Sequence, residues 1–200
     1  MDLDLDEAPE SPYNKESNPR VNSKKKGNRW ELQLTKILGE IFGDEFRRVP
    51  MSGAFCGGIN RFRNQSVNQD AKNALTGDLI VPTWFPFSVE AKNYEDSPKM
   101  HNLLSIGDKD LDKWIEQAKE ESKMSKRDWI VIFNITSKRR SFVAVDYKKF
   151  LEVTKSSLSS SIVYKDTIIF DMEDFLNKMA IYYFPENWRE IRDSNKIKNI

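Results

Sequence analysis

Two carboxylates and a lysine lie close together in the sequence around short apolar segments. Asp78 precedes the apolar run at 79–81, and Glu90 and Lys92 are two residues apart within the segment "SVEAKN". Because side chains alternate along a β-strand, Glu90 and Lys92 share one face, while their apolar neighbours share the other face and pack into the core. We therefore predict that the polar face looks into a cleft.

The chemistry open to these side chains depends on whether the two carboxylates converge. If the segments that carry Asp78 and Glu90 pair as a hairpin, the carboxylates approach each other and repel unless a cation lies between them. The chain has a single histidine and a single cysteine, so oxygen ligands favour Mg²⁺ or Mn²⁺ over zinc. Lys92 would then orient a water or offset charge on a phosphate. The alternative is two unrelated surface acids and an ordinary ion pair of the lysine.

A predicted helix upstream carries a third candidate carboxylate, Glu31. Apolar residues at helical spacing predict a helix from Asn28 that ends at Gly43, and Glu31 projects onto its apolar side. An unpaired charge there is costly. Glu31 therefore forms either a salt bridge at the start of the helix or part of a metal or DNA site.

The remaining elements predict an α/β domain with a mixed sheet, because helices and strands alternate along the chain. A long basic loop at about 54–76 separates the first strand from the strand that follows Asp78. The expected elements, in order, are a short strand ending at Pro50, a hairpin formed by 77–82 and 84–93, a helix containing 111–118, a hairpin formed by 128–136 and 140–147, a helix at about 146–154, a strand at about 161–170 and a helix from Met172.

The 200 residues suit one domain with additions at both ends. We expect a flexible N-terminal tail over 1–27, a core over 28–150 and a C-terminal extension over 151–200 that packs on the core or on a dimer interface. No apolar run is long enough to span a membrane and the acidic N-terminus is not a signal peptide, so the sequence predicts an intracellular protein with no membrane partner.

Any binding of nucleic acid must use local basic patches, because the net charge is only +1. Basic side chains gather before the first helix, in the long loop and at the tip of the second hairpin. The candidates for DNA contact are Lys24, Lys25, Lys26, Arg29, Arg48, Arg61, Arg63, Lys72, Arg139 and Arg140.

Taken together, these motifs resemble a known family. The arrangement of Gly77-Asp78 followed by Glu90-Ala91-Lys92 resembles the PD-(D/E)XK nuclease superfamily, with Gly77 where a proline is usual. The upstream segments "GNRWE" and "RRVPMSG" are similar to the helix start and to the strand and turn of archaeal-type Holliday junction resolvases. The resemblance covers roughly residues 24–150 and implies a restriction-endonuclease-like core, a mixed central β-sheet flanked by helices.

The resemblance also implies a role for each matching residue. Asp78 and Glu90, with the carbonyl of Ala91 and with Glu31 directly or through water, would hold one or two Mg²⁺ or Mn²⁺ ions. The implied catalytic set is Glu31, Asp78, Glu90, Lys92 as the catalytic lysine, Ser52 as an active-site hydroxyl and Gln117 as a positioning residue. No organic cofactor is implied.

The expected function is a metal-dependent endonuclease that resolves four-way DNA junctions as a homodimer. The alternatives are a restriction-like or repair nuclease acting on linear or other branched DNA, and a non-catalytic DNA-binding module with the same fold. Three features depart from the family pattern: the long loop at 54–76, the 50 C-terminal residues, and Gly77, which is tolerable because the proline is a turn residue and not a ligand. The size and Lys/Asn-rich composition would suit a phage or mobile-element protein.

Overall fold

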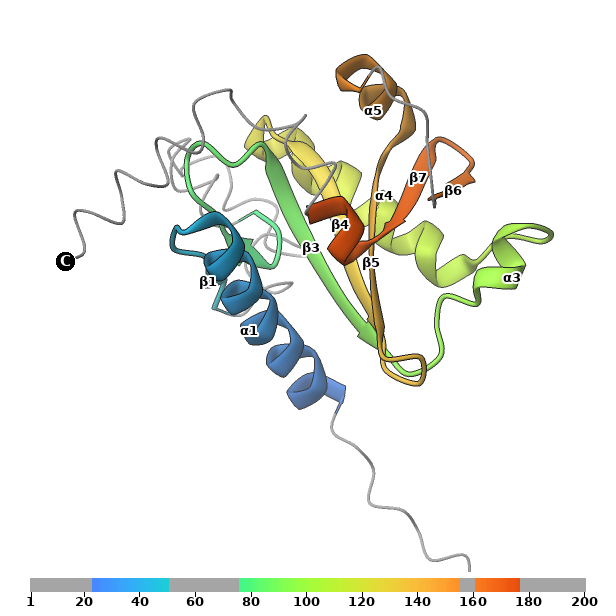
Figure 1. Cartoon of the computed structure of the whole chain (residues 1–200), viewed down its shortest axis with the longest axis horizontal. Helices are drawn as coiled ribbons and strands as arrows, with labels where there is room; N and C mark the ends of the chain where they lie inside the picture. Colours follow the sequence, from blue (N-terminus) through green and yellow to red (C-terminus); the bar gives the residue numbers. More distant parts are fainter. Residues whose placement is uncertain (1–22, 51–75, 155–160, 177–200) are drawn as a thin grey trace, which may run out of the picture.

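The computed structural model describes residues 23–50, 76–154 and 161–176, with the side chains of 23 and 24 excepted. Its elements alternate between helices and strands along the chain (Figure 1). They are α1 (Ser23–Phe42), β1 (Arg47–Arg48), β2 (Leu79–Ile80), β3 (Phe87–Tyr94), α3 (Met100–Leu103), α4 (Lys109–Ser125), β4 (Asp128–Ile135), β5 (Arg140–Asp146), α5 (Tyr147–Val153), β6 (Ser161–Tyr164), β7 (Thr167–Asp171) and α6 (Met172–Asp174).

A mixed five-stranded sheet in the order β3-β4-β5-β7-β6 forms the centre of the molecule. β3 and β4 are parallel, with Glu90 opposite Val131, and the other neighbours are antiparallel. The parallel pair needs a crossover, which α3 and α4 supply. This architecture confirms the predicted α/β fold with a mixed central sheet flanked by helices.

Two apolar cores cover the two faces of the sheet. Leu34, Leu38 and Phe42 of α1 pack with Val89 and Ala91 of β3 on one face, where α5 and α6 also contribute side chains. On the other face, a second core joins α4 to the alternate residues of β4 and β5. In Figure 1 α1 runs alongside β3, and α4 passes behind β4 and β5. The helical spacing of apolar residues in the sequence therefore predicted the buried faces of α1 and α4 correctly.

The predicted hairpin between the segments at 77–82 and 84–93 is wrong. β2 pairs with β1 instead, in an antiparallel ladder that sets Arg48 opposite Leu79. β2 meets β3 at Asp78, whose N–H donates to the carbonyl of Val89 at 2.8 Å. The connection between the two segments is short, but β2 forms its ladder with β1, and it is Asp78 that hydrogen-bonds to the backbone of β3.

Several boundaries also differ from the sequence expectation. α1 begins at Ser23, so the predicted tail over 1–27 overlaps the first turn of the helix. The single strand expected at about 161–170 is a hairpin of β6 and β7, which turns at Lys165 with φ of 55°. β7 pairs with β5, so this part of the expected C-terminal extension continues the central sheet. None of the described helices is long and apolar enough to cross a membrane.

Candidate active site

Glu90 and Lys92 project from the face of β3 that is opposite to the α1 core. Val89 and Ala91 pack into that core, and the alternation of the strand turns their polar neighbours toward α4. Glu90 is 1% exposed. A carboxylate this deep in the sheet needs compensation, because burial of an unpaired charge is costly.

Asp78 is attached to the free edge of β3 at two points. Its N–H donates to the Val89 carbonyl, and its Oδ2 accepts from the Ala91 N–H at 2.8 Å. The N–H and C=O of one strand residue point to the same side, so the Ala91 carbonyl also faces this edge. The edge therefore gathers the Asp78 carboxylate and the Ala91 backbone beside Glu90.

Gly77 makes this attachment possible. Its φ is +80°, and a Cβ at this position would lie 2.6 Å from the Val89 carbonyl oxygen. Proline, which the family pattern places here, fixes φ near −65° and cannot adopt this conformation. Glycine at residue 77 is therefore favoured by the backbone conformation and by the close approach to Val89, and is not merely tolerable as the sequence suggested.

Glu90 and Lys92 are in contact through Oε1 and Nζ. Burial raises the pKa of Glu90 well above its usual range, the charge of Asp78 adds to the rise, and Lys92 opposes it. For Lys92, burial lowers the pKa, but the charge of Glu90 and the hydrogen bond to it raise the pKa overall. The sequence allowed either a metal site or an ordinary ion pair of Lys92. The structure shows the ion pair, but it lies in the interior and beside a second carboxylate, that of Asp78.

A hydrogen-bonded relay on α4 holds the lysine. Nζ of Lys92 donates to Oε1 of Gln117 at 3.2 Å, and Nε2 of Gln117 donates to Oε1 of Glu121 at 3.1 Å. Burial raises the pKa of Glu121, with a further contribution from Asp78 and an opposing hydrogen bond from the Gly77 backbone. Glu121 therefore belongs to the site, and its place four residues after Gln117 on one face of α4 was the sequence signal that could have identified it.

Glu31 enters the site from α1 and carries its own partner. It is 8% exposed and pairs with Arg48 of β1, which also donates to Oδ1 of Asn28 at 2.9 Å. Burial raises the pKa of Glu31 despite the hydrogen bond from Arg48, and the charge of Asp78 raises it further. The structure thus shows a salt bridge for Glu31, within the electrostatic reach of Asp78 and Lys92, although α1 begins at Ser23 and Glu31 does not lie at its start.

The predicted metal ligands are near one another but do not form a ligand cluster. In residues 23–50, 76–154 and 161–176, no three Asp, Glu, His or Cys side chains are arranged to hold a metal ion. The reason is visible in the contacts: Glu31 faces Arg48, Oε1 of Glu90 faces Lys92, and Oδ2 of Asp78 accepts from the Ala91 N–H. The ligand set of Asp78, Glu90, Ala91 and Glu31 therefore stays a prediction.

The donor set nevertheless fits a hard cation. Oε2 of Glu90 is buried and has no hydrogen-bond partner among the described residues. An orphaned carboxylate oxygen in the interior is costly, and a cation between it and Asp78 would offset both the desolvation and the mutual repulsion. Asp78, Glu90 and the Ala91 carbonyl supply only oxygen, which suits Mg²⁺ or Mn²⁺.

The other predicted site residues are dispersed or lie outside the described residues. Ser52 and the loop candidates Arg61, Arg63 and Lys72 lie outside, and the Lys24 side chain is not described. Arg48 contacts Glu31 within the site. The remaining candidates for DNA contact fall in two places: Lys25, Lys26 and Arg29 lie on the first turns of α1, and Arg139 and Arg140 lie at the end of the turn before β5 and at the first residue of β5.

The chain is similar to known phage proteins. The chain is 33% identical over 117 residues to "Protein D14" of Escherichia phage T5, a match that covers 56% of this chain and 64% of that relative. The chain thus matches somewhat less than two thirds of the relative's length. No solved structure matches significantly. A family model matches residues 22–193, nearly the whole chain and all of the site. The chain therefore belongs to the family described as "Phage putative PDDEXK endonuclease".

Proposed function

We propose that the protein is a metal-dependent, structure-selective DNA endonuclease that resolves four-way junctions. The observation that carries the proposal is the buried Glu90, whose Oε2 lacks a partner while Asp78 and Lys92 stand beside it. A DNA-binding module would have no use for acids gathered near an anionic polymer, because they repel its phosphates. A hydrolase, in contrast, would use these acids to bind a cation between them.

In the proposed reaction, the oxygen of a water bonds to the scissile phosphorus, the bond from phosphorus to O3′ breaks, and the 3′ oxygen takes up a proton. A 5′-phosphate and a 3′-hydroxyl result. One or two Mg²⁺ or Mn²⁺ ions, when bound by Asp78, Glu90 and the Ala91 carbonyl, would supply Lewis-acid stabilisation of the phosphate and a more acidic water.

The protein's own groups do the rest by position. Lys92 is held by Glu90 and Gln117, and in the proposed reaction its ammonium offsets the charge that builds up on the phosphate in the transition state. Asp78 stays against the β3 edge through the Ala91 N–H. Glu31 remains bound to Arg48 and contributes negative potential from α1.

The proposed molecule is a homodimer that makes paired cuts. A four-way junction has two-fold symmetry, and a two-fold dimer presents the same site to two opposed strands. As a member of a phage family, it would act on DNA within the host cell. Sedimentation of the protein with and without a junction tests this part: a monomer on the junction would overturn it.

One assay tests the activity. The protein is incubated with a four-way junction or a matching linear duplex, in Mg²⁺, Mn²⁺ or EDTA. Paired symmetric nicks in the junction alone, lost in EDTA, are expected. Equal cutting of the duplex would instead identify a nuclease of linear DNA, and tight binding without cutting would identify a binding module.

The site is tested separately by two substitutions. Asp78→Asn and Glu90→Gln are expected to abolish cleavage while junction binding persists, since each removes a charge and preserves the shape of the side chain. Glu116→Gln, on the exposed side of α4, is the control and should cut as the wild type does. If either site variant cuts at the wild-type rate, the assignment of these carboxylates is wrong.

A further inference from the structure

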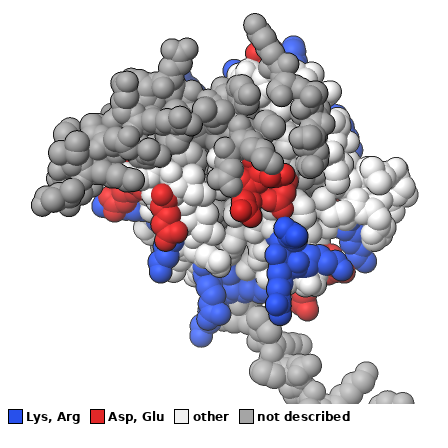
Figure 2. Space-filling view, in the orientation of Figure 1, with Lys and Arg blue, Asp and Glu red and all other residues white. Residues whose placement is uncertain are grey.

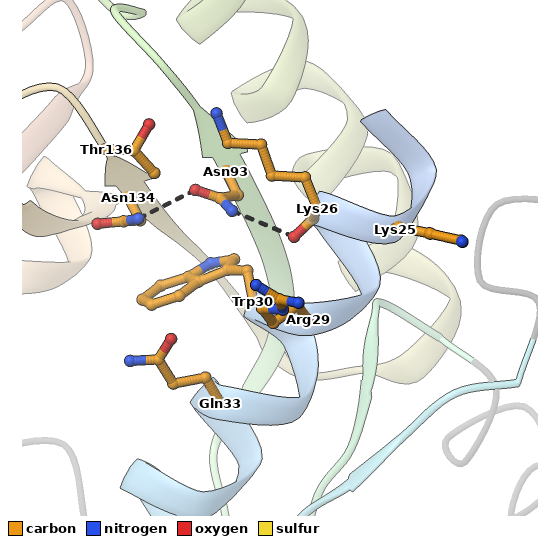
Figure 3. A pocket seen from close by; sticks show the side chains of 8 residues that line it. All are labelled: Lys25, Lys26, Arg29, Trp30, Gln33, Asn93, Asn134 and Thr136. Atoms are coloured by element: carbon orange, nitrogen blue, oxygen red, sulfur yellow. Dashed lines mark hydrogen bonds between the residues drawn. The ribbon is translucent and has the colours of Figure 1, made fainter. Parts of the chain in front are cut away.

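A cavity of about 490 Å³ lies between the first turns of α1 and the ends of β3 and β4, on the face of β3 opposite to Glu90 and Lys92 (Figure 3). It shares both elements with the site, because Trp30 precedes Glu31 on α1 and Asn93 follows Lys92 on β3. Its described lining is Lys25, Lys26, Arg29, Trp30, Gln33, Asn93, Asn134 and Thr136. The volume falls within the range of pockets that bind small molecules, which is about 300–1,000 Å³.

One side of the cavity is positively charged. Lys25, Lys26 and Arg29 line it, and none of its described lining residues is acidic. These residues belong to the N-terminal part of α1, whose first turn carries no acidic residue. The positive end of the helix dipole is thus combined with cationic side chains, an arrangement that favours an anion. Figure 2 shows basic side chains gathered over this lower end of α1.

The other side is a floor of side-chain amides held in a fixed order. Ser141 donates to Oδ1 of Asn134, Nδ2 of Asn134 donates to Oδ1 of Asn93 at 3.0 Å, and Nδ2 of Asn93 donates to the Lys26 carbonyl at 3.2 Å. This chain ties the start of α1 to the sheet. These hydrogen bonds also fix the orientation of both amides, because each amide oxygen accepts and each amide nitrogen donates. Each nitrogen uses one of its two N–H groups in this way, so one N–H group of each amide is left for a ligand.

A buried donor faces this floor. Trp30 is 3% exposed, and its Nε1 is buried with no hydrogen-bond partner among the described residues. In Figure 3 the indole nitrogen lies on the edge of the ring that faces Asn93 and Asn134. A buried N–H without an acceptor is costly, and a ligand atom that accepts from it would recover that cost.

We propose that the cavity binds one nucleotide unit of nucleic acid. The phosphate lies against Lys25, Lys26 and Arg29, and the edge of the base accepts from Trp30 Nε1 and from the amides of Asn93 and Asn134. Inorganic phosphate alone would leave the amide floor and the indole N–H unused, whereas a nucleotide supplies an anion and a polar, planar group together.

This inference rests on the proposed function for the identity of the polymer as DNA. The base must leave the helical stack to enter the cavity, which costs least where the DNA is already unpaired or distorted. α1 and β3 each carry residues of both the cavity and the active site, so a captured nucleotide would lie on the α1 face of β3, with Glu90 and Lys92 on the opposite face of the same strand. Preference for branched DNA over a perfect duplex would follow from this capture.

The test uses the full chain with the Asp78→Asn substitution, labelled with ¹⁵N at its tryptophan indoles. Of the five indole N–H signals, the one that disappears in Trp30→Phe identifies Trp30. Titration with a deoxynucleoside monophosphate is expected to shift this signal, and inorganic phosphate at the same concentration should leave it in place. An equal shift with phosphate would mean an anion site only, and no shift with the nucleotide would overturn the proposal.

A second measurement keeps the inference independent of catalysis. The same protein is titrated onto a duplex with a one-nucleotide bulge and onto the matching perfect duplex. Trp30→Phe keeps the ring and removes the donor, so bulge binding should weaken about tenfold, the usual effect of one lost hydrogen bond. Lys36→Ala, exposed on α1 and outside the cavity lining, is the control for a substitution on the same helix and should not change the preference for the bulge.

The two proposals fail in different ways. Cleavage by the wild type without any nucleotide effect on Trp30 would leave the endonuclease standing and overturn the cavity assignment. A Trp30 shift and bulge preference without cleavage of any DNA would retain the cavity and overturn the catalytic function. Equal weakening of bulge and duplex binding by Trp30→Phe would also count against a site for an extruded nucleotide.

Discussion

At the scale of single residues, Glu90 is the group on which the site depends. It is almost fully buried, it has an uncompensated oxygen, and burial raises its pKa well above the usual range. The protein thus holds a carboxylate in a place where the proton and a metal ion would compete for it. That competition leads to two measurable consequences.

The first consequence is a dependence of stability on pH in metal-free protein. Because folding raises the pKa of Glu90 well above its ordinary value of 4.5, the native state binds more protons than the unfolded state above that pH. The free energy of unfolding should therefore fall as pH rises through this window, by at most about 1.4 kcal/mol per pH unit for one group. Urea denaturation in EDTA at several pH values measures the slope.

Glu90→Gln should flatten that slope, because the amide does not titrate. The pKa values of Glu31 and Glu121 are also raised on folding, and both residues remain in the variant. Only part of the pH dependence of stability therefore disappears. The raised pKa of Lys92 acts above 10.5 and lies outside the window. A variant with the same slope as the wild type would show that Glu90 is ionised in the native state throughout.

The second consequence concerns activity. Protonated Glu90 cannot bind a cation, so the rate of cleavage should fall as pH decreases. Raising the Mg²⁺ concentration should move this acidic limb to lower pH, because the ion displaces the proton. Rate profiles at two Mg²⁺ concentrations measure the displacement, and coincident limbs would mean that the titrating group does not contact the metal.

Gln117 gives a prediction about positioning. It joins Lys92 to Glu121, so Gln117→Ala should leave the ammonium less well fixed. Groups that orient the reacting shell of a metal site typically contribute about 10–100-fold to activity. We expect kcat to fall by this factor with little change in KM for DNA. Glu116→Ala on the same helix is the control; a change confined to KM would assign Gln117 to DNA binding.

At the scale of elements, the site depends on the junction between β2 and β3. β2 is only two residues long and pairs with β1, so the Gly77-Asp78 segment places the carboxylate by the two hydrogen bonds to β3. α1 and α4 approach the same strand from opposite faces and bring Glu31 and Gln117. Three elements distant in the sequence thus meet at one edge.

Gly77→Ala tests this junction. The positive φ and the close approach to Val89 predict a loss of about 1–3 kcal/mol in the free energy of unfolding, together with reduced cleavage as Asp78 moves. Gly27→Ala is the matched control, since a Cβ there has no neighbour within 4 Å and alanine favours the helix by up to about 1 kcal/mol. Wild-type stability and activity in Gly77→Ala would contradict the proposed strain.

At the scale of the whole molecule, charge is distributed unevenly although the net charge is only +1. Figure 2 shows basic side chains in the lower part of one face, over the end of α1 and the nearby ends of the strands, and acidic groups above them. The turn before β5 belongs to this basic region, since Asn134 and Thr136 just before it line the cavity. This region is the surface on which we expect the DNA backbone.

Arg139 is exposed at that turn with φ of 51°. Arg139→Asn removes the charge and retains a residue that tolerates this conformation. If Arg139 contacts a phosphate, binding should weaken uniformly across DNA sequences, and the slope of log K against log salt should decrease by about 1. Arg47→Ala, an exposed arginine paired with Glu45, is the control. An unchanged slope would place the DNA elsewhere.

The sequence by itself determined the parts of this protein that depend on local periodicity. Apolar spacing identified α1, α4 and the hairpin of β4 and β5, and alternation along β3 placed Glu90 and Lys92 on one face. These patterns repeat within a few residues, so they survive without knowledge of the partners. The motifs around Asp78 and Glu90 were likewise sufficient to indicate the nuclease family.

Only the tertiary structure decided how those parts meet. It paired β2 with β1, bound Glu31 to Arg48, added Glu121 to the site and enclosed Trp30 in a basic cavity. Each of these depends on contacts between segments far apart in the chain, whose pairing is set by packing and hydrogen-bond satisfaction over the whole sheet. Local patterns predict which side chains lie on each face of a strand or helix, whereas the tertiary structure determines which other side chains those residues contact.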